Sequence, residues 1–270
     1  MWKSLLVKLI GFSALLIHGD PLVLDRWLWL KKRLPRTRND ETLLDCGCGS
    51  GAFTIGTARR GYLTTGISNE RSNLESAKER ALHLAPYRTN FEVVDIRELE
   101  KQDEFTEHFD FALCLEVIEH ISDDRGLIVD LAKCMKPGGR LLLTTPNYHY
   151  FAITPDEEGP WTEEHETGGW HVRRGYTPMM LRELCDEAGL VVEEISYCSG
   201  IVSQKLTRLL RVLAKVHYLL GWSAILPFRI LPPFFDRLLT NVIGWQYYSI
   251  GLEAYKPRFG TSASIRISKA

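Results

Sequence analysis

The sequence predicts an α/β fold in which helices cover both faces of a doubly wound, mostly parallel sheet. Two observations predict this class. Short apolar runs alternate with segments of helical periodicity over most of the 270-residue chain. The first run, 42–45, leads into glycines at alternate positions and then into a helical pattern. Parallel strands need crossover connections, so this alternation places helices on both faces of the sheet.

The expected sheet has seven strands. Five of them alternate with helical patterns, at 42–45, 63–67, 91–94, 109–115 and 140–145. Two more are expected at 191–197 and 250–255, and the last of these is expected to run antiparallel. Ligands of such sheets bind outside the carboxyl ends of the strands, so the polar residues that end these runs are candidate site residues.

Capping residues mark the ends of two expected helices. Ser122 is expected to cap the helix that precedes the fifth strand. Thr177 and Pro178 mark the start of a later helix, and Gly189 marks its end.

The pattern divides the chain into three parts. Residues 1–38 form an expected N-terminal helical segment, whose second piece begins at Pro21 and packs on the main domain. Residues 39–200 and 248–270 form the main domain. Residues 201–247 interrupt it as a helical and aromatic insertion.

Composition excludes some classes of function. The formal net charge is −1, so no overall basic field favours nucleic acid as a partner. The six cysteines form no C-x-x-C pair, and a reducing, cytoplasmic compartment fits them best. The N-terminus carries an apolar run without a small-residue cleavage pattern, which disfavours a secretory signal.

Three glycines follow the first expected strand. Asp45 ends the strand, and Gly47, Gly49 and Gly51 come next at alternate positions. Glycine has no Cβ and tolerates positive φ, so a ligand can approach the backbone of such a turn closely. The spacing G-x-G-x-G differs from the G-x-G-x-x-G of dinucleotide folds.

Together with three later blocks, this turn resembles the class I S-adenosylmethionine-dependent methyltransferases, in particular their small-molecule and ubiquinone-pathway members. The four blocks lie at 43–51, 93–96, 109–121 and 135–139, and the resemblance extends over 42–198. It implies a Rossmann-like fold, an enzyme that transfers methyl groups, and S-adenosyl-L-methionine as cofactor.

The resemblance implies roles by position. Asp45 would bind the ammonium of the methionine moiety, directly or through water, because a carboxylate suits a cation. Asp95 would accept a hydrogen bond from the adenine amino group, with Ile96 against the ring. Leu115 would offer its carbonyl near the methionine moiety. The implied cofactor-binding residues are Asp45, Cys46, Gly47, Gly49, Gly51, Ser68, Asn69, Asp95, Ile96, Leu115 and Glu116.

One departure from the family pattern concerns the ribose. Family members often carry an acid at the end of the second strand, where it holds both ribose hydroxyls. Ser68 occupies this position here, followed by Asn69 and Glu70. Either a single hydrogen bond from Ser68 or one of its two neighbours would have to replace the acid.

Methyl transfer needs little chemistry from the protein. The sulfonium is already activated, so the acceptor must be aligned with the methyl group, and a hydroxyl acceptor also needs a base. An oxygen is the expected target. Candidate bases are His149, His165 and His171, of which His171 is preferred; a structural, hydrogen-bonded histidine is the alternative.

A second interpretation involves a metal ion. Glu116-x-x-Glu119-His120 resembles the E-x-x-E-H motif of small-RNA 2′-O-methyltransferases and ubiquinone-pathway O-methyltransferases, which a later histidine, here His171, would complete. Such a set suits manganese or zinc better than magnesium. The same run is also common in the family without a metal, so no metal ligand is assigned. A non-catalytic S-adenosylmethionine-binding protein is the remaining alternative.

The insertion at 201–247 carries an apolar and aromatic stretch, 219–235, beside basic residues such as Lys205 and Arg208. Its prolines make it a poor spanning helix. It is expected either to pack as a helical cap or to contact the inner face of a membrane peripherally. The expected acceptor is a small molecule that is sugar-linked, lipid-like or a secondary metabolite; the oligomeric state is left open.

Overall fold

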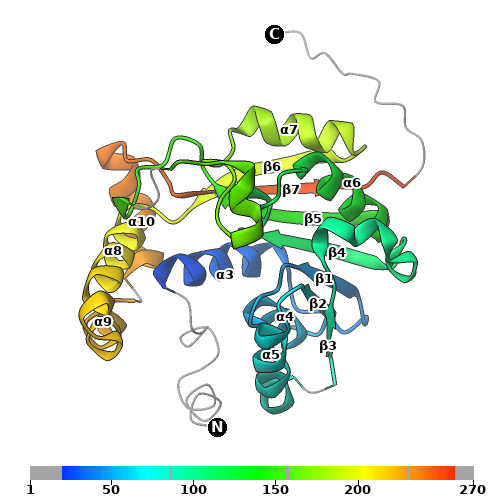
Figure 1. Ribbon diagram of the computed structural model, residues 1–270, viewed down its shortest axis with the longest axis horizontal. Coiled ribbons are helices and arrows are strands. Elements are labelled where there is room, and N and C mark those ends of the chain that lie inside the picture. The colour runs from blue at the N-terminus through cyan, green and yellow to red at the C-terminus, as the bar shows by residue number, and fades with distance from the viewer. Residues whose placement is uncertain (1–19, 86, 156–158, 230, 259–270) are drawn as a thin grey trace.

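The computed structural model describes residues 20–85, 87–155, 159–229 and 231–258 (Figure 1). The first expected helical piece, within 1–19, lies outside these residues. The second expected piece is helix α3, which begins at Pro21 as predicted; Asp20 caps it by accepting a hydrogen bond from the amide of Leu22.

Seven strands form one sheet in the order β3-β2-β1-β4-β5-β7-β6. Their bounds are Thr42–Cys46 (β1), Leu63–Ser68 (β2), Thr89–Val93 (β3), Phe109–Leu115 (β4), Met135–Pro146 (β5), Val191–Cys198 (β6) and Ser249–Tyr255 (β7). The strands β1 to β5 pair in parallel, whereas β7 runs antiparallel between β5 and β6. The predicted fold class is therefore confirmed, including the antiparallel last strand.

Helices cover both faces of this sheet (Figure 1). The α-helices are Pro21–Arg33 (α3), Ala52–Ala58 (α4), Arg71–Leu84 (α5), Asp124–Cys134 (α6), Pro178–Glu187 (α7), Ile201–Val216 (α8), Tyr218–Ile225 (α9) and Pro232–Ile243 (α10). Alternate residues of a strand point to opposite faces. Leu44 accordingly packs in the cluster that includes α6 and α7, whereas Leu43 packs with α3.

One predicted helix cap is confirmed and one is wrong. Thr177 caps α7, where its side chain accepts a hydrogen bond from the amide of Met180. Helix α6 is capped by Asp123 rather than Ser122. The amide of Ser122 donates instead to the carboxylate of Glu166, a contact between distant parts of the chain.

Helix α3 packs on one face of the sheet, where its apolar side chains share a core cluster with residues of β1, β4, β5 and β6. A Cβ atom at Gly251 of β7 would lie 2.6 Å from the Trp29 ring, so the glycine makes room for the indole. The indole nitrogen donates to Ser196 of β6 at 2.9 Å, and the Arg33 guanidinium lies 4.2 Å from the ring centroid. These contacts fix the angle of α3, which carries Arg26 toward the carboxyl ends of the strands.

Residues 201–247 fold as α8, α9, the short 3₁₀ helix η6 (Leu226–Phe228) and α10. Asp236 of α10 caps α8 by accepting from the amides of Gly200 and Val202, both at 2.8 Å. Asp25 of α3 hydrogen-bonds Ser203 of α8. These buried carboxylates join α8 to α10 and to α3, beside the sheet (Figure 1).

Candidate functional site

The glycine turn after β1 has two closely packed positions and one open position. All three glycines are left-handed, with φ of 74°, 49° and 77°. A Cβ at Gly47 would lie 2.6 Å from Val117, and one at Gly51 would lie 2.7 Å from Ala77. A Cβ at Gly49 would meet nothing within 4 Å. Packing therefore requires the outer two glycines, and the middle one faces open space.

Asp45 lies beneath this turn and is only 2% exposed. Its carboxylate accepts a hydrogen bond of 2.6 Å from the Thr54 hydroxyl, in the first turn of α4. Burial raises the pKa of Asp45 to about 6, against the lowering effect of that hydrogen bond. The next residue, Cys46, is a fully buried thiol at the end of β1. A buried carboxylate with one side-chain donor is suited to a cationic ligand group.

The end of β2 carries no free acid. Ser68 is nearly buried, and its hydroxyl accepts from the amide of Glu70 at 3.2 Å. The Glu70 carboxylate is held by the side chains of Ser72 and Asn73, at 2.9 and 2.7 Å. Asn69 is exposed between these residues. Glu70 therefore serves the start of α5, which leaves Ser68 and Asn69 as the predicted ribose contacts.

The end of β3 leads into Asp95, which caps the 3₁₀ helix η1 (Ile96–Lys101). Its carboxylate accepts from the amide of Arg97 at 3.0 Å and forms an ion pair of 2.5 Å with the Arg97 guanidinium. This arginine lowers the pKa of Asp95. Ile96 is partly buried against the main core. Asp95 is thus an ionised carboxylate with a fixed orientation.

Residues at the end of β4 contact helix α3. Leu115 is nearly buried, and Glu116 has a left-handed backbone with φ 56°. The Glu116 carboxylate forms an ion pair of 3.2 Å with Arg26 and accepts from Ser249 of β7 at 3.1 Å. Arg26 could not be predicted from the sequence, because no local pattern links a residue of α3 with the end of β4.

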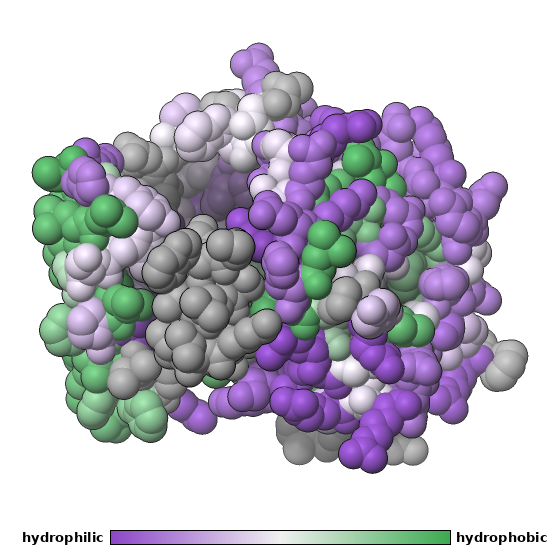
Figure 2. Space-filling view, turned by 90° about the horizontal axis from the view of Figure 1, so that it is seen from below, coloured by the Kyte–Doolittle hydropathy of each residue, from purple (hydrophilic) through white to green (hydrophobic). Residues whose placement is uncertain are grey.

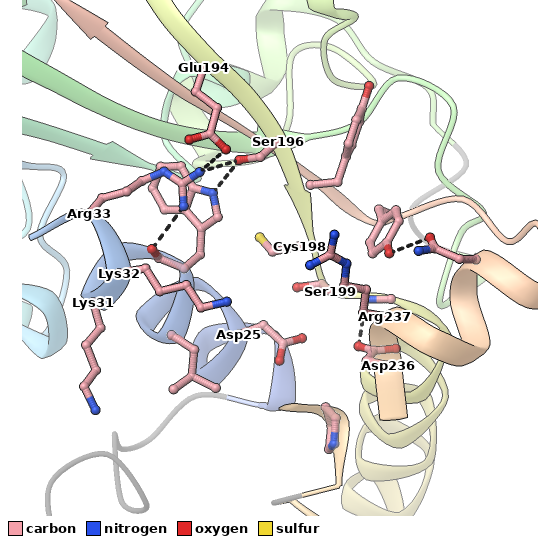
Figure 3. A pocket seen from close by; sticks show the side chains of 17 residues that line it. Asp25, Lys31, Lys32, Arg33, Glu194, Ser196, Cys198, Ser199, Asp236 and Arg237 are labelled. Carbon is pink, nitrogen blue, oxygen red and sulfur yellow. Dashed lines mark hydrogen bonds and ion pairs between the residues drawn. The ribbon is translucent and has the colours of Figure 1, made fainter. Parts of the chain in front are cut away.

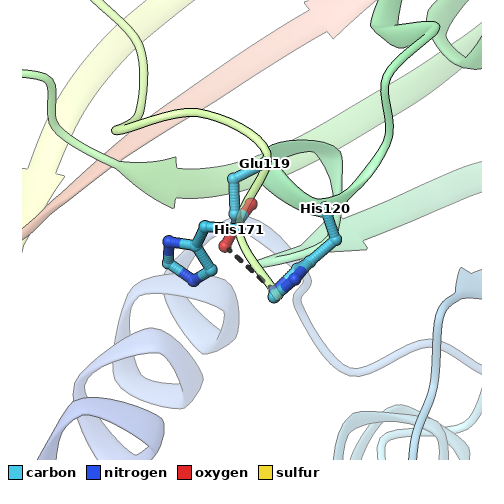
Figure 4. Close-up of side chains that lie close together, drawn as sticks. All are labelled: Glu119, His120 and His171. Carbon is cyan, nitrogen blue, oxygen red and sulfur yellow. Dashed lines mark ion pairs between the residues drawn. The ribbon is translucent and has the colours of Figure 1, made fainter. Parts of the chain in front are cut away.

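A second cluster lies next to Glu116. Figure 4 shows Glu119 and His120, which follow β4, facing His171 from the loop before α7, and potential ligand atoms of all three lie within 4.8 Å of one another. The loop is held by a hydrogen bond of 2.9 Å from the Val172 amide to the Glu119 carbonyl. Glu119 is fully buried; one carboxylate oxygen accepts from Thr145 at 3.1 Å.

Two buried polar atoms of this cluster form no hydrogen bond with a described residue, although the Glu119 oxygen among them lies 4.0 Å from the Nε2 atom of His120 (Figure 4). The second oxygen of Glu119 and the Nδ1 atom of His120 are buried without a hydrogen bond. Burial raises the pKa of Glu119 well above its usual range and lowers the pKa of His120. Burial, reinforced by neighbouring His120, lowers the pKa of His171 to about 4. Both imidazoles are therefore neutral near pH 7 and can accept a proton or bind a metal.

The structure brings together three of the four residues of the predicted metal set. Glu116 is not part of the cluster, because its carboxylate is bound by Arg26 and Ser249. Of the other candidate bases, His149 is exposed beside Tyr148, and the side chain of His165 lies outside the described residues.

A family model described as a methyltransferase domain matches residues 24–195. The chain belongs to this family. The resemblance seen in the sequence is thereby confirmed, and the matched methyltransferase domain contains the glycine turn, the strand ends and the histidine cluster.

Among curated proteins, the domain is similar to the ubiquinone biosynthesis O-methyltransferase of Alkalilimnicola ehrlichii. The two are 35% identical over 115 residues, which cover 41% of this chain and 45% of the relative. A second relative of the same name, from Coxiella burnetii, is 32% identical, over 43% of this chain and 48% of the relative. The chain thus spans about half the length of these curated relatives.

Among solved structures, the fold is similar to that of phosphoethanolamine N-methyltransferase 2 of Haemonchus contortus in complex with S-adenosyl-L-methionine. The TM-score is 0.62 at 17% identity, and the match covers 95% of this chain and 60% of that protein. At these identities the likeness concerns the fold alone.

Proposed function

We propose that this chain transfers a methyl group from S-adenosylmethionine to an oxygen of a small, lipid-like acceptor. The observation that carries the proposal is the pairing of buried Asp45 with a glycine turn whose middle residue faces open space. The amino-acid part of the cofactor would lie over Gly49, with its ammonium held by Asp45. Asp95 and Ile96 would hold the adenine, and Ser68 or Asn69 the ribose.

The acceptor would lie next to Leu115 and the histidine cluster. Burial lowers the pKa of His171 to about 4, which keeps the imidazole neutral at physiological pH and makes it a weaker base than an ordinary histidine. A neutral imidazole beside the acceptor can take up the proton that the hydroxyl loses as its oxygen attacks the methyl group. Alignment of that oxygen with the carbon–sulfur bond supplies the rest of the rate enhancement. The similarity to ubiquinone biosynthesis O-methyltransferases supports a quinone-like phenol as the acceptor class.

A divalent ion held by Glu119, His120 and His171 is a second candidate for activation of the acceptor. The donors fit, because one carboxyl group and two neutral imidazoles converge and one Glu119 oxygen accepts no hydrogen bond from a described residue. This mixed set suits Mn²⁺ or Zn²⁺ better than Mg²⁺. A bound ion would act as a Lewis acid that favours the ionised form of the acceptor hydroxyl.

If the cluster holds an ion, Mn²⁺ or Zn²⁺ is expected to bind with one-to-one stoichiometry and to raise the melting temperature. Glu119→Gln should abolish this binding, because the amide cannot ionise, whereas the Glu119 carboxyl can release its proton when the ion binds. His149→Ala is the matched control and should bind the ion like the wild type. Calorimetric titration of the metal-free chain measures both. An ion that binds the wild type and Glu119→Gln equally well would contradict the assignment.

The helices α8 to α10 provide the surface for a lipid-like acceptor. Their exposed apolar side chains, each at least 39% accessible, form what we term the apolar cap surface: Leu209, Val212, Val216, Tyr218, Leu219, Leu220, Leu226, Phe228, Phe234, Phe235, Leu238, Leu239, Val242 and Ile243. Figure 2 shows hydrophobic residues gathered at this end of the molecule, whereas polar residues dominate elsewhere on the same face. Large exposed apolar patches mark contact sites.

Charge favours a membrane as the partner of the apolar cap surface. Residues 201–247 carry six lysines and arginines but one acid, Asp236, which is buried as the cap of α8. Apolar side chains beside an excess of basic residues are the pattern of helices that lie on anionic bilayers. No helix in the described parts of the chain has the length and apolar character needed to cross a membrane.

The proposal is tested by incubating the chain with S-adenosylmethionine and detergent-solubilised phenols that carry prenyl chains. Release of S-adenosylhomocysteine together with a methylated phenol is expected. A chain that binds the cofactor but methylates none of these phenols, nor other hydroxylated acceptors, would instead be a binding protein. A chain that binds no S-adenosylmethionine would contradict both interpretations.

A further inference from the structure

A groove of about 800 Å³ opens between α3, β6 and α10 (Figure 3). None of the glycine-turn or histidine-cluster residues lines it. We term it the α3–α10 groove. Helix α3 contributes Asp25, Lys31, Lys32 and Arg33, β6 contributes Glu194 and Ser196, and α10 contributes Asp236 and Arg237.

The acids of the α3–α10 groove all have partners. Glu194 forms an ion pair of 2.8 Å with Arg33. Asp236 accepts from amides at the start of α8, and Asp25 is hydrogen-bonded to Ser203. Each of these carboxyl groups therefore already interacts with a cation or with hydrogen-bond donors of the protein itself.

Three cations of the α3–α10 groove have no such partner among the described residues: Lys31, whose side chain points away from the groove in Figure 3, Lys32 and Arg237. Lys32 and Arg237 are exposed, and neither forms a hydrogen bond or ion pair through its side chain with another described residue. In Figure 3 both side chains extend from opposite helices toward the space between α3 and α10. Two unpaired cations across a groove attract an anion that each can contact.

The α3–α10 groove adjoins the apolar cap surface. A second hollow, of about 530 Å³, is lined by Phe234, Leu238 and Val242, and it shares Arg237 and Asn241 with the groove. The three apolar residues recur at intervals of four and are exposed along one face of α10. An amphiphile could thus place its anionic part between the cations and its chains along α10.

We propose that the α3–α10 groove binds the phosphate of an anionic lipid headgroup, held between Lys32 and Arg237, while the apolar cap surface contacts the acyl chains. The inference rests on the membrane contact in the proposed function. It adds a specific site, which would fix the orientation of α3 and α10 on the bilayer. A soluble phosphate ester carries the same anionic group and is the alternative ligand for this groove.

Flotation with vesicles tests the site. Wild type should bind phosphatidylcholine vesicles that contain phosphatidylglycerol at least about tenfold more tightly than vesicles of phosphatidylcholine alone, since each cation near an anionic surface adds about 1 kcal/mol. Lys32→Ala combined with Arg237→Ala should lose most of this preference, and Lys32→Arg with Arg237→Lys should retain it. Lys78→Ala with Arg182→Ala, on α5 and α7, removes the same charge away from the groove and should float like the wild type.

Competition separates the two sources of the anion. Inorganic phosphate and glycerol phosphate are titrated at constant ionic strength, with and without vesicles. Displacement of the wild type from anionic vesicles, or heat of binding that the double alanine variant lacks, supports phosphate recognition in the groove. The site is overturned if the double alanine variant keeps the preference for anionic vesicles within twofold.

Failure of this site is distinguishable from failure of the wider proposal. Equal flotation of the wild type on neutral and anionic vesicles would overturn the headgroup site and leave the apolar contact standing. Absence of flotation on any vesicle would overturn both the site and the membrane contact. Binding of S-adenosylmethionine, measured on the same samples, reports independently on the methyl-donor site.

Discussion

Replacement of His171 by alanine is expected to lower kcat for methyl transfer by about 10²- to 10⁴-fold, the range typical for loss of a general base. The histidine faces Glu119 and His120 next to the end of β4, where the acceptor is placed. It lies in a different segment from the glycine turn, so the affinity for S-adenosylmethionine should stay within about twofold. Steady-state rates of S-adenosylhomocysteine release, together with calorimetric titration of the cofactor, measure both quantities.

His149→Ala is the matched control, because this histidine belongs to the same polar segment but is exposed beside Tyr148. It should retain wild-type rates. A His171→Ala variant with an unchanged kcat would remove this residue from the reaction. Sensitivity of the wild type to chelators distinguishes the two roles of His171. If His171 acts only as a base, the wild type keeps its activity after chelation. If His171 binds a metal, the chelated wild type should be as inactive as His171→Ala.

Replacement of Asp45 by asparagine is expected to weaken S-adenosylmethionine binding by about 10- to 100-fold. Asparagine matches the shape and can still accept the Thr54 hydrogen bond, but it removes the charge that the ammonium needs. A hydrogen bond to a charged group contributes about 1.5–3 kcal/mol, which corresponds to this loss. An Asp45→Asn variant with wild-type affinity would show that the carboxylate does not bind the cofactor.

The pH dependence of cofactor binding provides a second test of Asp45. Its pKa without ligand is raised to about 6, so a proton and the ammonium compete for the same carboxylate. Wild-type affinity should be highest near pH 7, where the carboxylate and the ligand ammonium are both charged, and fall by about tenfold per unit below pH 6. Asp45→Asn should lack this dependence. Titrations between pH 5 and 8 measure it, and parallel curves for the two proteins would contradict the role.

The sequence predicted the parts of the site that local chemistry determines. Alternate glycines after a strand-end acid require a tight turn, and the structure gives all three glycines a left-handed backbone. Thr54 was missed as the partner of Asp45, although its place in the first turn of the following helix carried a usable signal.

Contacts between distant segments could not be predicted. The ion pair between Glu116 and Arg26 depends on how α3 packs on the sheet, and it removes Glu116 from the predicted metal set. Asp123 rather than Ser122 caps α6, by accepting from the amide of Gly126, and the amide of Ser122 donates to Glu166 from a remote segment. Strand β5 begins at Met135 rather than at 140, because the backbone of Gly138 and Gly139 pairs with Lys256.

A crystal structure of the chain with S-adenosylhomocysteine tests the central claim most directly. The ligand is expected at the carboxyl ends of β1 to β4, with its amino-acid part over Gly49 and its ammonium next to Asp45, directly or through one water. Its adenine should lie beside Asp95 and Ile96, and its sulfur should face the histidine cluster. A ligand bound elsewhere, or bound here with Asp45 remote from the ammonium, would contradict this account.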